Sequence, residues 1–395
     1  MSVRAKLQAG VPRGQAVRAI RAWTLSTIKE RVSMFSLKPL VLAVSALTSF
    51  SAMAAFDSAT LTQEGNNNEV TLNQSAGTYN TATQTQTGDD NQAIAEQTNS
   101  NNSTIEQVQA GNANLSRATQ AYAEESSITT DQNGSNNTVL AGQDDVSTST
   151  ITVTQGGDAH TVAVQQIGTT DSTVTVYQEG TGHTASITQA GSNHLAEAYT
   201  YGSNNTVNAS QQGAFMGGQY GSDLTMFFGQ SGDSNVVNAS QQGFDNELWT
   251  GQYDANNTIT VEQSGFGNGL RLAQDENNNV MTSEQAGRNN TQAMTQSGNN
   301  NELNISQDGM DQRATLISQG DNNEVNITQN GTIGGVDITQ TGNDNLVSTT
   351  QNGDFLLSTI TQTGDINQIQ LNQTNAWSQA YIQQTGTGNS ATVSQ

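Results

Sequence analysis

From Gln63 to the end of the chain, apolar and polar residues alternate in short segments. In one segment, the residues of one parity are Asn301, Leu303, Ile305 and Gln307. The segments at 68–74 and 323–329 repeat this pattern. A period of two is typical of a strand with one buried face. Glycine, with aspartate or asparagine close to it, follows most segments and indicates a turn.

The glutamine that closes each segment recurs along the chain. The steps alternate between 11 and 12 residues from Gln63 to Gln189, and every step is 11 residues from Gln219 to Gln395. Glycine usually follows two residues later and asparagine five residues later. Thr200 and Ser318 stand where glutamine is expected, and the step from Gln211 to Gln219 is only eight residues. Repeats of this length indicate a solenoid.

The sequence therefore predicts an all-β fold, a cross-β-like β-solenoid of about 15 stacked strand–turn–strand rungs with two facing parallel sheets. At the usual strand spacing of ~4.8 Å, the stack rises about 70 Å. Equivalent amides on successive rungs are expected to form hydrogen-bonded ladders. The expected ladder residues are Gln63, Asn68, Gln74, Gln86, Asn91, Gln97, Gln109, Asn114, Gln120, Gln230, Asn235, Gln241, Gln296, Asn301, Gln307, Asn323, Gln329, Gln384, Asn389 and Gln395. The expected turn glycines are Gly65, Gly88, Gly111, Gly134, Gly298, Gly342 and Gly386.

The chain divides into four parts by period and composition. Residues 1–55 form a leader, in which Lys38 precedes an apolar run and Ala52-Met53-Ala54 offers a cleavage site, as in a secretory signal peptide. Met34 would make an ordinary start for that signal. Residues 56–199 carry repeats of 23 residues, 200–220 form an irregular junction, and 221–395 carry repeats of 22 residues. The apolar run is too short for a stable membrane span of about 20 residues.

Charge excludes one class of partner. From Phe56 onward there are four arginines, no lysine and 34 acidic residues, a formal net charge of −30. Such a surface repels nucleic acid. Cysteine is absent, so no disulfide or thiolate chemistry is expected.

The repeat region has no proline and no lysine, the residues that usually block sheet edges. The two end rungs are therefore expected to be open to another chain. The sequence predicts a subunit that polymerises with itself by templated stacking.

Two groups of side chains are candidate ligand sites. His160, His183 and His194 occupy ladder positions, where they are expected to replace amides rather than bind metal, because no carboxylate or cysteine joins them at ligand spacing. Aspartates follow the turn glycines, and the 11-residue step differs from the nine-residue calcium repeat. We expect their charge repulsion to slow premature aggregation. These aspartates are Asp89, Asp90, Asp158, Asp233, Asp321, Asp354 and Asp365.

Aromatic residues cluster between Tyr199 and Phe266, around the junction. Core filling where the period changes is the favoured interpretation, and an exposed adhesive patch is the other. The residues are Tyr199, Tyr201, Phe215, Tyr220, Phe227, Phe228, Phe244, Trp249, Tyr253 and Phe266. No catalytic constellation, metal set or cofactor motif is visible in the sequence, so no enzyme activity is expected.

The unit Gln-x-Gly-x-x-Asn-x-x-x-(Ile/Leu/Val/Ala)-x-Gln resembles the curlin repeat of curli, the bacterial extracellular amyloid fibres. The resemblance covers roughly residues 57–395. It implies a secreted fibre subunit of the biofilm matrix that serves adhesion and surface attachment, with a nucleator subunit and an outer-membrane secretion channel as partners. About fifteen repeats replace the family's usual five, and the Gly/Asn-rich targeting stretch of its major subunit is missing.

Two other functions stay open. The chain could be the minor nucleating subunit of the fibre. It could also be a monomeric solenoid adhesin or an ice-binding module, because Thr-x-Thr occurs at residues 81–83, 83–85 and 173–175, although not at one fixed place in every rung.

Overall fold

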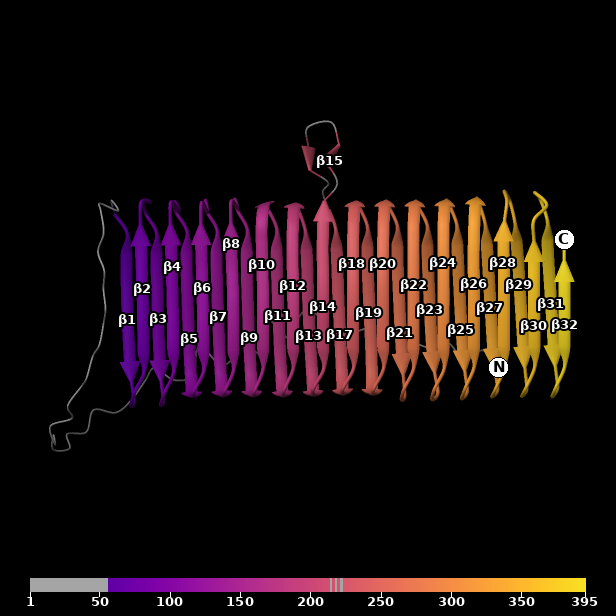
Figure 1. Cartoon of the computed structure of the whole chain (residues 1–395), viewed down its shortest axis with the longest axis horizontal. Coiled ribbons are helices and arrows are strands. Elements are labelled where there is room, and N and C mark those ends of the chain that lie inside the picture. The colour runs from indigo at the N-terminus through magenta and orange to yellow at the C-terminus, as the bar shows by residue number, and fades with distance from the viewer. Residues whose placement is uncertain (1–55, 214, 217–218, 221–222) are drawn as a thin grey trace, which may run out of the picture. The chain divides into compact units, whose positions relative to one another are not determined.

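A computed structural model describes residues 56–395 apart from 214, 217–218 and 221–222; the leader, residues 1–55, lies outside the described residues. Two 15-stranded parallel sheets make up the described chain (Figure 1). The predicted all-β solenoid with two parallel sheets is confirmed.

The strands alternate between the two sheets along the chain, so each rung contributes one strand to each sheet. The odd sheet contains β1 (Ser58–Glu64), β3 (Thr81–Thr87), β5 (Thr104–Asn112), β7 (Ser127–Ser135), β9 (Thr150–Asp158), β11 (Thr173–Thr181), β13 (Leu195–Ser203), β17 (Thr225–Asp233), β19 (Glu247–Ala255), β21 (Gly269–Asp275), β23 (Thr291–Ser297), β25 (Arg313–Gln319), β27 (Gly335–Thr341), β29 (Leu357–Thr363) and β31 (Gln379–Thr385). The even sheet contains β2 (Glu69–Ser75), β4 (Gln92–Thr98), β6 (Leu115–Ala121), β8 (Thr138–Asp144), β10 (Thr161–Thr170), β12 (Thr184–Ser192), β14 (Thr206–Gly213), β18 (Val236–Phe244), β20 (Thr258–Phe266), β22 (Val280–Arg288), β24 (Glu302–Met310), β26 (Glu324–Thr332), β28 (Leu346–Asn352), β30 (Gln368–Gln373) and β32 (Ser390–Ser394).

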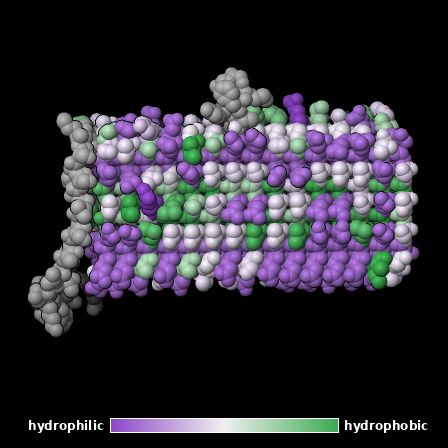
Figure 2. Space-filling view, viewed as in Figure 1, coloured by the Kyte–Doolittle hydropathy of each residue, from purple (hydrophilic) through white to green (hydrophobic). Residues whose placement is uncertain are grey.

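The core lies between the two sheets, where each strand contributes its inward parity. Val70 and Leu72 of β2 are buried, as are the equivalent residues of most later strands. Because parallel pairing keeps equivalent residues in register, like side chains stack on like. Figure 2 shows the outer counterpart of this order, in bands of similar hydropathy that run along the stack.

The change of period is taken up without breaking either sheet. Gln155 pairs with Gln178 at a separation of 23 residues, and Gln178 pairs with Thr200 at 22. Across the junction, Gln211 pairs with Gln241 at a separation of 30. The eight added residues are accounted for by an insertion, which contains the antiparallel pair β15 (Phe215–Met216) and β16 (Gln219–Tyr220). Counting Gln219 as a register position was therefore wrong, because it lies outside the two large sheets.

The longer turn of the 23-residue rungs is regular. Its extra residues form a column of isolated parallel bridges from Thr78 to Thr170. The residues at one equivalent place in this turn all have φ between 52° and 55°: Ala76, Asn99, Tyr122 and Asp145. Repetition of one strained conformation lets this turn stack as evenly as the glycine turn.

Among the described residues, no helix has the length and apolar character needed to cross a membrane.

Candidate stacking site: the amide ladders

Glutamine side chains form one hydrogen-bonded ladder under each sheet. In the odd sheet, Gln63 Nε2 donates to Gln86 Oε1 at 2.8 Å, and Gln86 Nε2 donates to Gln109 Oε1 at 2.8 Å. The even sheet repeats this from Gln74 to Gln97 and from Gln97 to Gln120. Each amide donates toward the C-terminal end of the stack and accepts from the N-terminal side. The remaining expected glutamines lie in these same two ladders: Gln230, Gln241, Gln296, Gln307, Gln329, Gln384 and Gln395.

Asparagine side chains form a second kind of ladder at the turns. Asn68 Oδ1 accepts the backbone N–H of Asn91 at 3.0 Å, and Asn91 Nδ2 donates to the Gly111 carbonyl at 2.7 Å. These bonds satisfy backbone groups that the turn leaves outside the sheet ladder. Asn114, Asn235 and Asn323 make both kinds of bond. Asn301 Oδ1 accepts the backbone N–H of Asn323, and Asn389, in the last rung, donates its N–H to Asn367 Oδ1.

The turn glycines pack backbone against backbone. Gly65 and Gly298 have φ of 118° and 115°, and a Cβ on either would overlap the carbonyl oxygen of the glycine one rung later. Gly88, Gly111, Gly134 and Gly342 are in the same situation. Gly386, in the last rung, has no later rung above it, and a Cβ there would meet only Asn389 Nδ2 at 3.1 Å. Close approach and a positive φ both favour glycine here. Asp254 and Glu276 are the exceptions in this column, with φ of 62° and 69°.

Sequence reasoning missed a third, short ladder. Gln84 is buried inside β3, and its Nε2 donates to Gln107 Oε1 at 2.7 Å. Gln107 Nε2 in turn reaches Ser116 Oγ at 2.8 Å. The available signal was parity, since Gln84 shares the inward parity of Ala82 and Gln86.

Two rungs interrupt the glutamine ladder and leave polar atoms unpaired. Thr200 replaces glutamine in β13, where Gln178 Nε2 and Gln230 Oε1 are buried without hydrogen-bond partners. Ser318 donates to Gln340 Oε1 at 3.2 Å but cannot satisfy Gln296 Nε2. The shorter side chain breaks the ladder in both cases.

We predict that Thr200→Gln stabilises the solenoid. The new amide would accept from Gln178 and donate to Gln230, which satisfies two buried atoms and adds about 1–2 kcal/mol to the free energy of unfolding. Chemical denaturation followed by circular dichroism measures this. Thr225→Gln, on an outward position of the next strand, is the control and is expected to change little; destabilisation by Thr200→Gln alone would contradict the ladder geometry.

Histidines replace asparagine atom for atom in the turn ladder. His160 Nδ1 accepts the backbone N–H of His183 at 3.2 Å, as Asn Oδ1 does elsewhere. His160 Nε2 lies 3.2 Å from the Gly156 carbonyl, in the position of an amide Nδ2. The two rings are buried and stacked, with centroids 5.0 Å apart. His194 is buried in the facing turn, with Nε2 3.0 Å from the Ala190 carbonyl. This geometry suits neutral imidazole with the proton on Nε2.

Acid is therefore expected to weaken these rungs. Burial lowers the pKa of His160, His183 and His194, against the opposing effects of Asp158, Asp233 and Asp223. Below about pH 6.5 the unfolded chain takes up protons that the folded rungs exclude, so stability falls as pH drops through that value and is level above it. Denaturation midpoints between pH 5 and 8 test this. The double variant His160→Asn/His183→Asn should remove most of the dependence of the denaturation midpoint on pH. An unchanged dependence would mean that groups other than these histidines cause it.

The turn aspartates differ from their expected role. Asp89 Oδ1 accepts the Asn66 backbone N–H at 2.8 Å, and Asp321 Oδ1 accepts that of Asn299 at 2.7 Å. In the column that contains Asp89 and Asp321, one to three uncharged residues separate successive aspartates, so no two aspartates lie on adjacent rungs. The hydrogen bonds link rungs, where repulsion was expected. Asp158, Asp233, Asp354 and Asp365 also accept from the preceding rung.

Core filling by the aromatic cluster was mostly a wrong interpretation. Of the cluster residues whose side chains are described, Phe228 alone is buried in the core. Phe227 and Trp249 lie on the outward parity of the odd sheet, with ring centroids 4.1 Å apart. The Thr-x-Thr residues also point outward from this sheet. Thr83 and Thr175 lie in one column, which the strand pairing continues through Glu106, Thr129 and Thr152.

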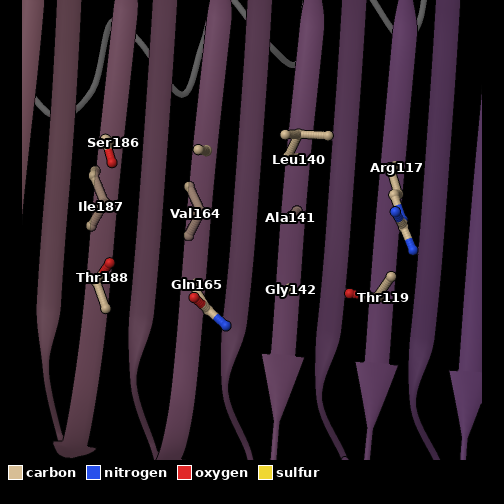
Figure 3. A pocket seen from close by; sticks show the side chains of 11 residues that line it. Arg117, Thr119, Leu140, Ala141, Gly142, Val164, Gln165, Ser186, Ile187 and Thr188 are labelled. Carbon is tan, nitrogen blue, oxygen red and sulfur yellow. The ribbon is translucent and has the colours of Figure 1, made fainter.

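A shallow depression on the outer face of the even sheet offers no chemistry. Its floor is Gly142, and its rim includes Arg117, Leu140 and Gln165 (Figure 3). No acid, histidine or cysteine lines it. Among the described residues there is also no cluster of three histidine, cysteine or acidic side chains that could hold a metal ion.

Comparison with protein families decides the assignment. The model of the curlin associated repeat matches residues 169–198, 184–213, 298–331 and 342–374. The chain contains curlin associated repeats at these places. The resemblance expected from the sequence is confirmed. No curated protein matches the chain.

The matched segments lie on both sides of the junction. Residues 169–213 span β11 to β14, and the later matches lie between β24 and β30. Both the late rungs of the first block and the 22-residue rungs therefore carry the repeat. Curlin repeats belong to fibre subunits rather than enzymes, and the solenoid fits that class.

Proposed function

We propose that this protein is the structural subunit of an extracellular, curli-like amyloid fibre that serves adhesion and surface attachment in a biofilm matrix. Subunits join by head-to-tail stacking of their end rungs. The supporting observation is that the core is incomplete at both ends. Leu61 of β1 and Ala391 and Val393 of β32 pack on the core yet remain only partly buried. The protein acts by assembly, without catalysis or cofactor.

The two end rungs match each other position by position. If β31 of one copy pairs with β1 of the next, Ile382 meets Leu61 and Gln384 meets Gln63. If β32 pairs with β2, Val393 meets Leu72 and Gln395 meets Gln74. Apolar residues thus meet apolar residues and amides meet amides, in the register that the internal rungs use. A slip of one residue would bury the outward polar set, so this register is strongly favoured.

The amide ladders give the junction a direction. At the C-terminal end, Gln384 and Gln395 have no later amide to donate to. At the N-terminal end, Gln63 and Gln74 have no earlier amide to accept from within residues 56–395. A head-to-tail junction pairs these groups, whereas two N-terminal ends would bring acceptors together. The exposed strand edges of both end rungs add unpaired backbone groups.

Seeded assembly tests the proposal. Purified protein without its first 54 residues is incubated alone and with fragmented preformed fibres, and amyloid-dye fluorescence is followed. Seeds are expected to abolish the lag. Protein that stays monomeric at high concentration and binds no dye would refute the fibre function. Cross-seeding of a second subunit tests whether this chain is instead the nucleator.

The same proposal places the protein outside the cell. The predicted signal peptide delivers it to the periplasm, an outer-membrane channel exports it, and a nucleator subunit starts its assembly at the cell surface. Its net charge of −30 beyond residue 55 argues against nucleic acid as a ligand.

A second candidate function is supported by the threonine columns. Thr150 and Thr152 of β9 and Thr173 and Thr175 of β11 form a regular outward array on the odd sheet. The array ends at β13, where Leu195 and Glu197 replace threonine. An ordered hydroxyl and methyl surface of this kind suits binding to ice. Inhibition of ice recrystallisation by unassembled protein would favour this function.

A further inference from the structure

One column of turn residues carries bulky aromatic side chains only near the ends of the stack. The column lies two residues before each strand of the odd sheet, and each of its non-glycine members has a positive φ. Its first two members are Phe56 and Tyr79, and its last two are Phe355 and Trp377. The ten between Tyr79 and Ile333 are Asn102, Glu125, Thr148, Asp171, Asn193, Asp223, Asp245, Gly267, Asn289 and Asp311.

Aromatic residues are a costly choice for this conformation. A positive φ favours glycine, asparagine and aspartate, and a bulky side chain there is an outlier. The middle of the column mostly follows that preference. Phe56, Tyr79, Phe355 and Trp377 depart from it with φ of 71°, 60°, 58° and 66°. Such strain persists where the side chain gains something in return.

Packing within one molecule does not supply that gain. Phe56 is 75% exposed, Tyr79 58% and Trp377 72%. The rings do stack in pairs along the solenoid axis, Phe56 on Tyr79 at 5.1 Å and Phe355 on Trp377 at 4.0 Å, both with an interplanar angle of 7°. Each pair thus leaves its outermost ring, Phe56 or Trp377, without a ring beyond it.

We propose that Trp377 of one copy stacks on Phe56 of the next and forms an aromatic clasp across every fibre junction. The inference rests on the proposed head-to-tail function and names the residues that fix the junction. In the register described above, Trp377 and Phe56 occupy successive places in the column. The clasp is a ladder of four rings, Phe355, Trp377, Phe56 and Tyr79, at about the rung spacing of ~4.8 Å.

The backbone geometry agrees with this arrangement. Within the molecule, the column residues from Asn102 to Asn193 and from Gly267 to Trp377 donate their N–H to the carbonyl of the residue before the column member of the preceding rung, as Trp377 N does to Asp354 O at 3.1 Å. By the same rule, Phe56 N donates to Ala376 O of the neighbouring copy. With the predicted cleavage after Ala54, Phe56 is the second residue of the mature chain.

Asparagine substitutions separate the clasp from folding. Trp377→Asn and Phe56→Asn relieve the strained φ, so the monomer should unfold at the same or a higher denaturant concentration. Each loses the junction stack, so the critical concentration for assembly should rise about tenfold. Tyr122→Asn is the matched control, because Tyr122 is 61% exposed with φ of 52° in an interior turn. It should leave the critical concentration unchanged.

A spectroscopic readout locates the ring directly. In the Trp249→Phe background, Trp377 is the single tryptophan of the mature chain, and its emission should shift to the blue on assembly. Unshifted emission, or asparagine variants that assemble like wild type, would overturn the clasp and leave the fibre function standing. An equal loss in Tyr122→Asn would assign the aromatics to side-to-side contacts and also overturn it. Failure of the wild type to assemble would refute the fibre function itself.

Discussion

Gly298→Ala is expected to cost about 4 kcal/mol of the free energy of unfolding, an exceptional loss for one methyl group. Gly298 has φ of 115°, and its added Cβ would overlap the Gly320 carbonyl oxygen of the next rung. Backbone strain of about 1–3 kcal/mol adds to a packing overlap of similar size. The rungs cannot move apart, because the strand hydrogen bonds fix their spacing. Denaturant unfolding followed by circular dichroism measures the loss.

Gly168→Ala is the matched control for that experiment. Gly168 also has a positive φ, 58°, but its added Cβ would meet nothing within 4 Å. The same substitution there should cost only about 1–2 kcal/mol, the backbone preference alone. Equal losses at the two positions would show that close approach of the turns is unimportant, and would contradict the stacking geometry.

Gln241→Glu is expected to destabilise the solenoid by about 3–5 kcal/mol at pH 7. Gln241 is buried; its Nε2 donates to Gln263 Oε1 at 2.7 Å and to the Thr225 carbonyl at 3.1 Å. A carboxylate donates neither bond and faces two oxygens. Burial raises the pKa of the new carboxyl, so its deficit relative to wild type should shrink as pH falls from 7 toward 4, where the protonated acid donates again. Unfolding midpoints across this range measure it.

The neighbouring residue supplies the control. Gln242 points outward and is exposed, so Gln242→Glu should change stability by less than about 0.5 kcal/mol at any pH. If both variants behaved alike, or if the Gln241→Glu deficit did not depend on pH, the ladder would not be a buried hydrogen-bonded element.

The periodic positions could be predicted from sequence because the fold repeats one local rule. Parity places Leu303 and Ile305 inside, and the fixed spacing stacks Gln285 on Gln307. Neither the burial nor the stacking needs long-range information to be predicted. The failures occur where the repeat is broken. Gln219 kept the residue type of the register but lies in an inserted hairpin, and spacing alone cannot show which strands pair across an insertion.

Side-chain roles outside the repeat needed coordinates for a different reason. Phe227 and Phe228 are adjacent in sequence, and parity relative to Gln230 sends Phe228 into the core and Phe227 outward, so residue type alone could not assign one role to the aromatic cluster. The turn aspartates looked repulsive in sequence because their neighbours one rung away lie 22 or 23 residues distant, and those neighbours proved to be donors such as Asn66 and Asn299. The aromatic residues near the two ends of the turn column lie far apart in the sequence, and only the stacked turns of the structure place them in one column.

Electron cryomicroscopy of fibres grown from the mature protein tests head-to-tail stacking most directly. The account predicts one continuous solenoid with strands perpendicular to the fibre axis, an axial repeat of about 72 Å for fifteen rungs at ~4.8 Å each, and Trp377 of one subunit against Phe56 of the next. Fibres built from solenoids packed side by side, or from strands in a register other than the internal one, would contradict it.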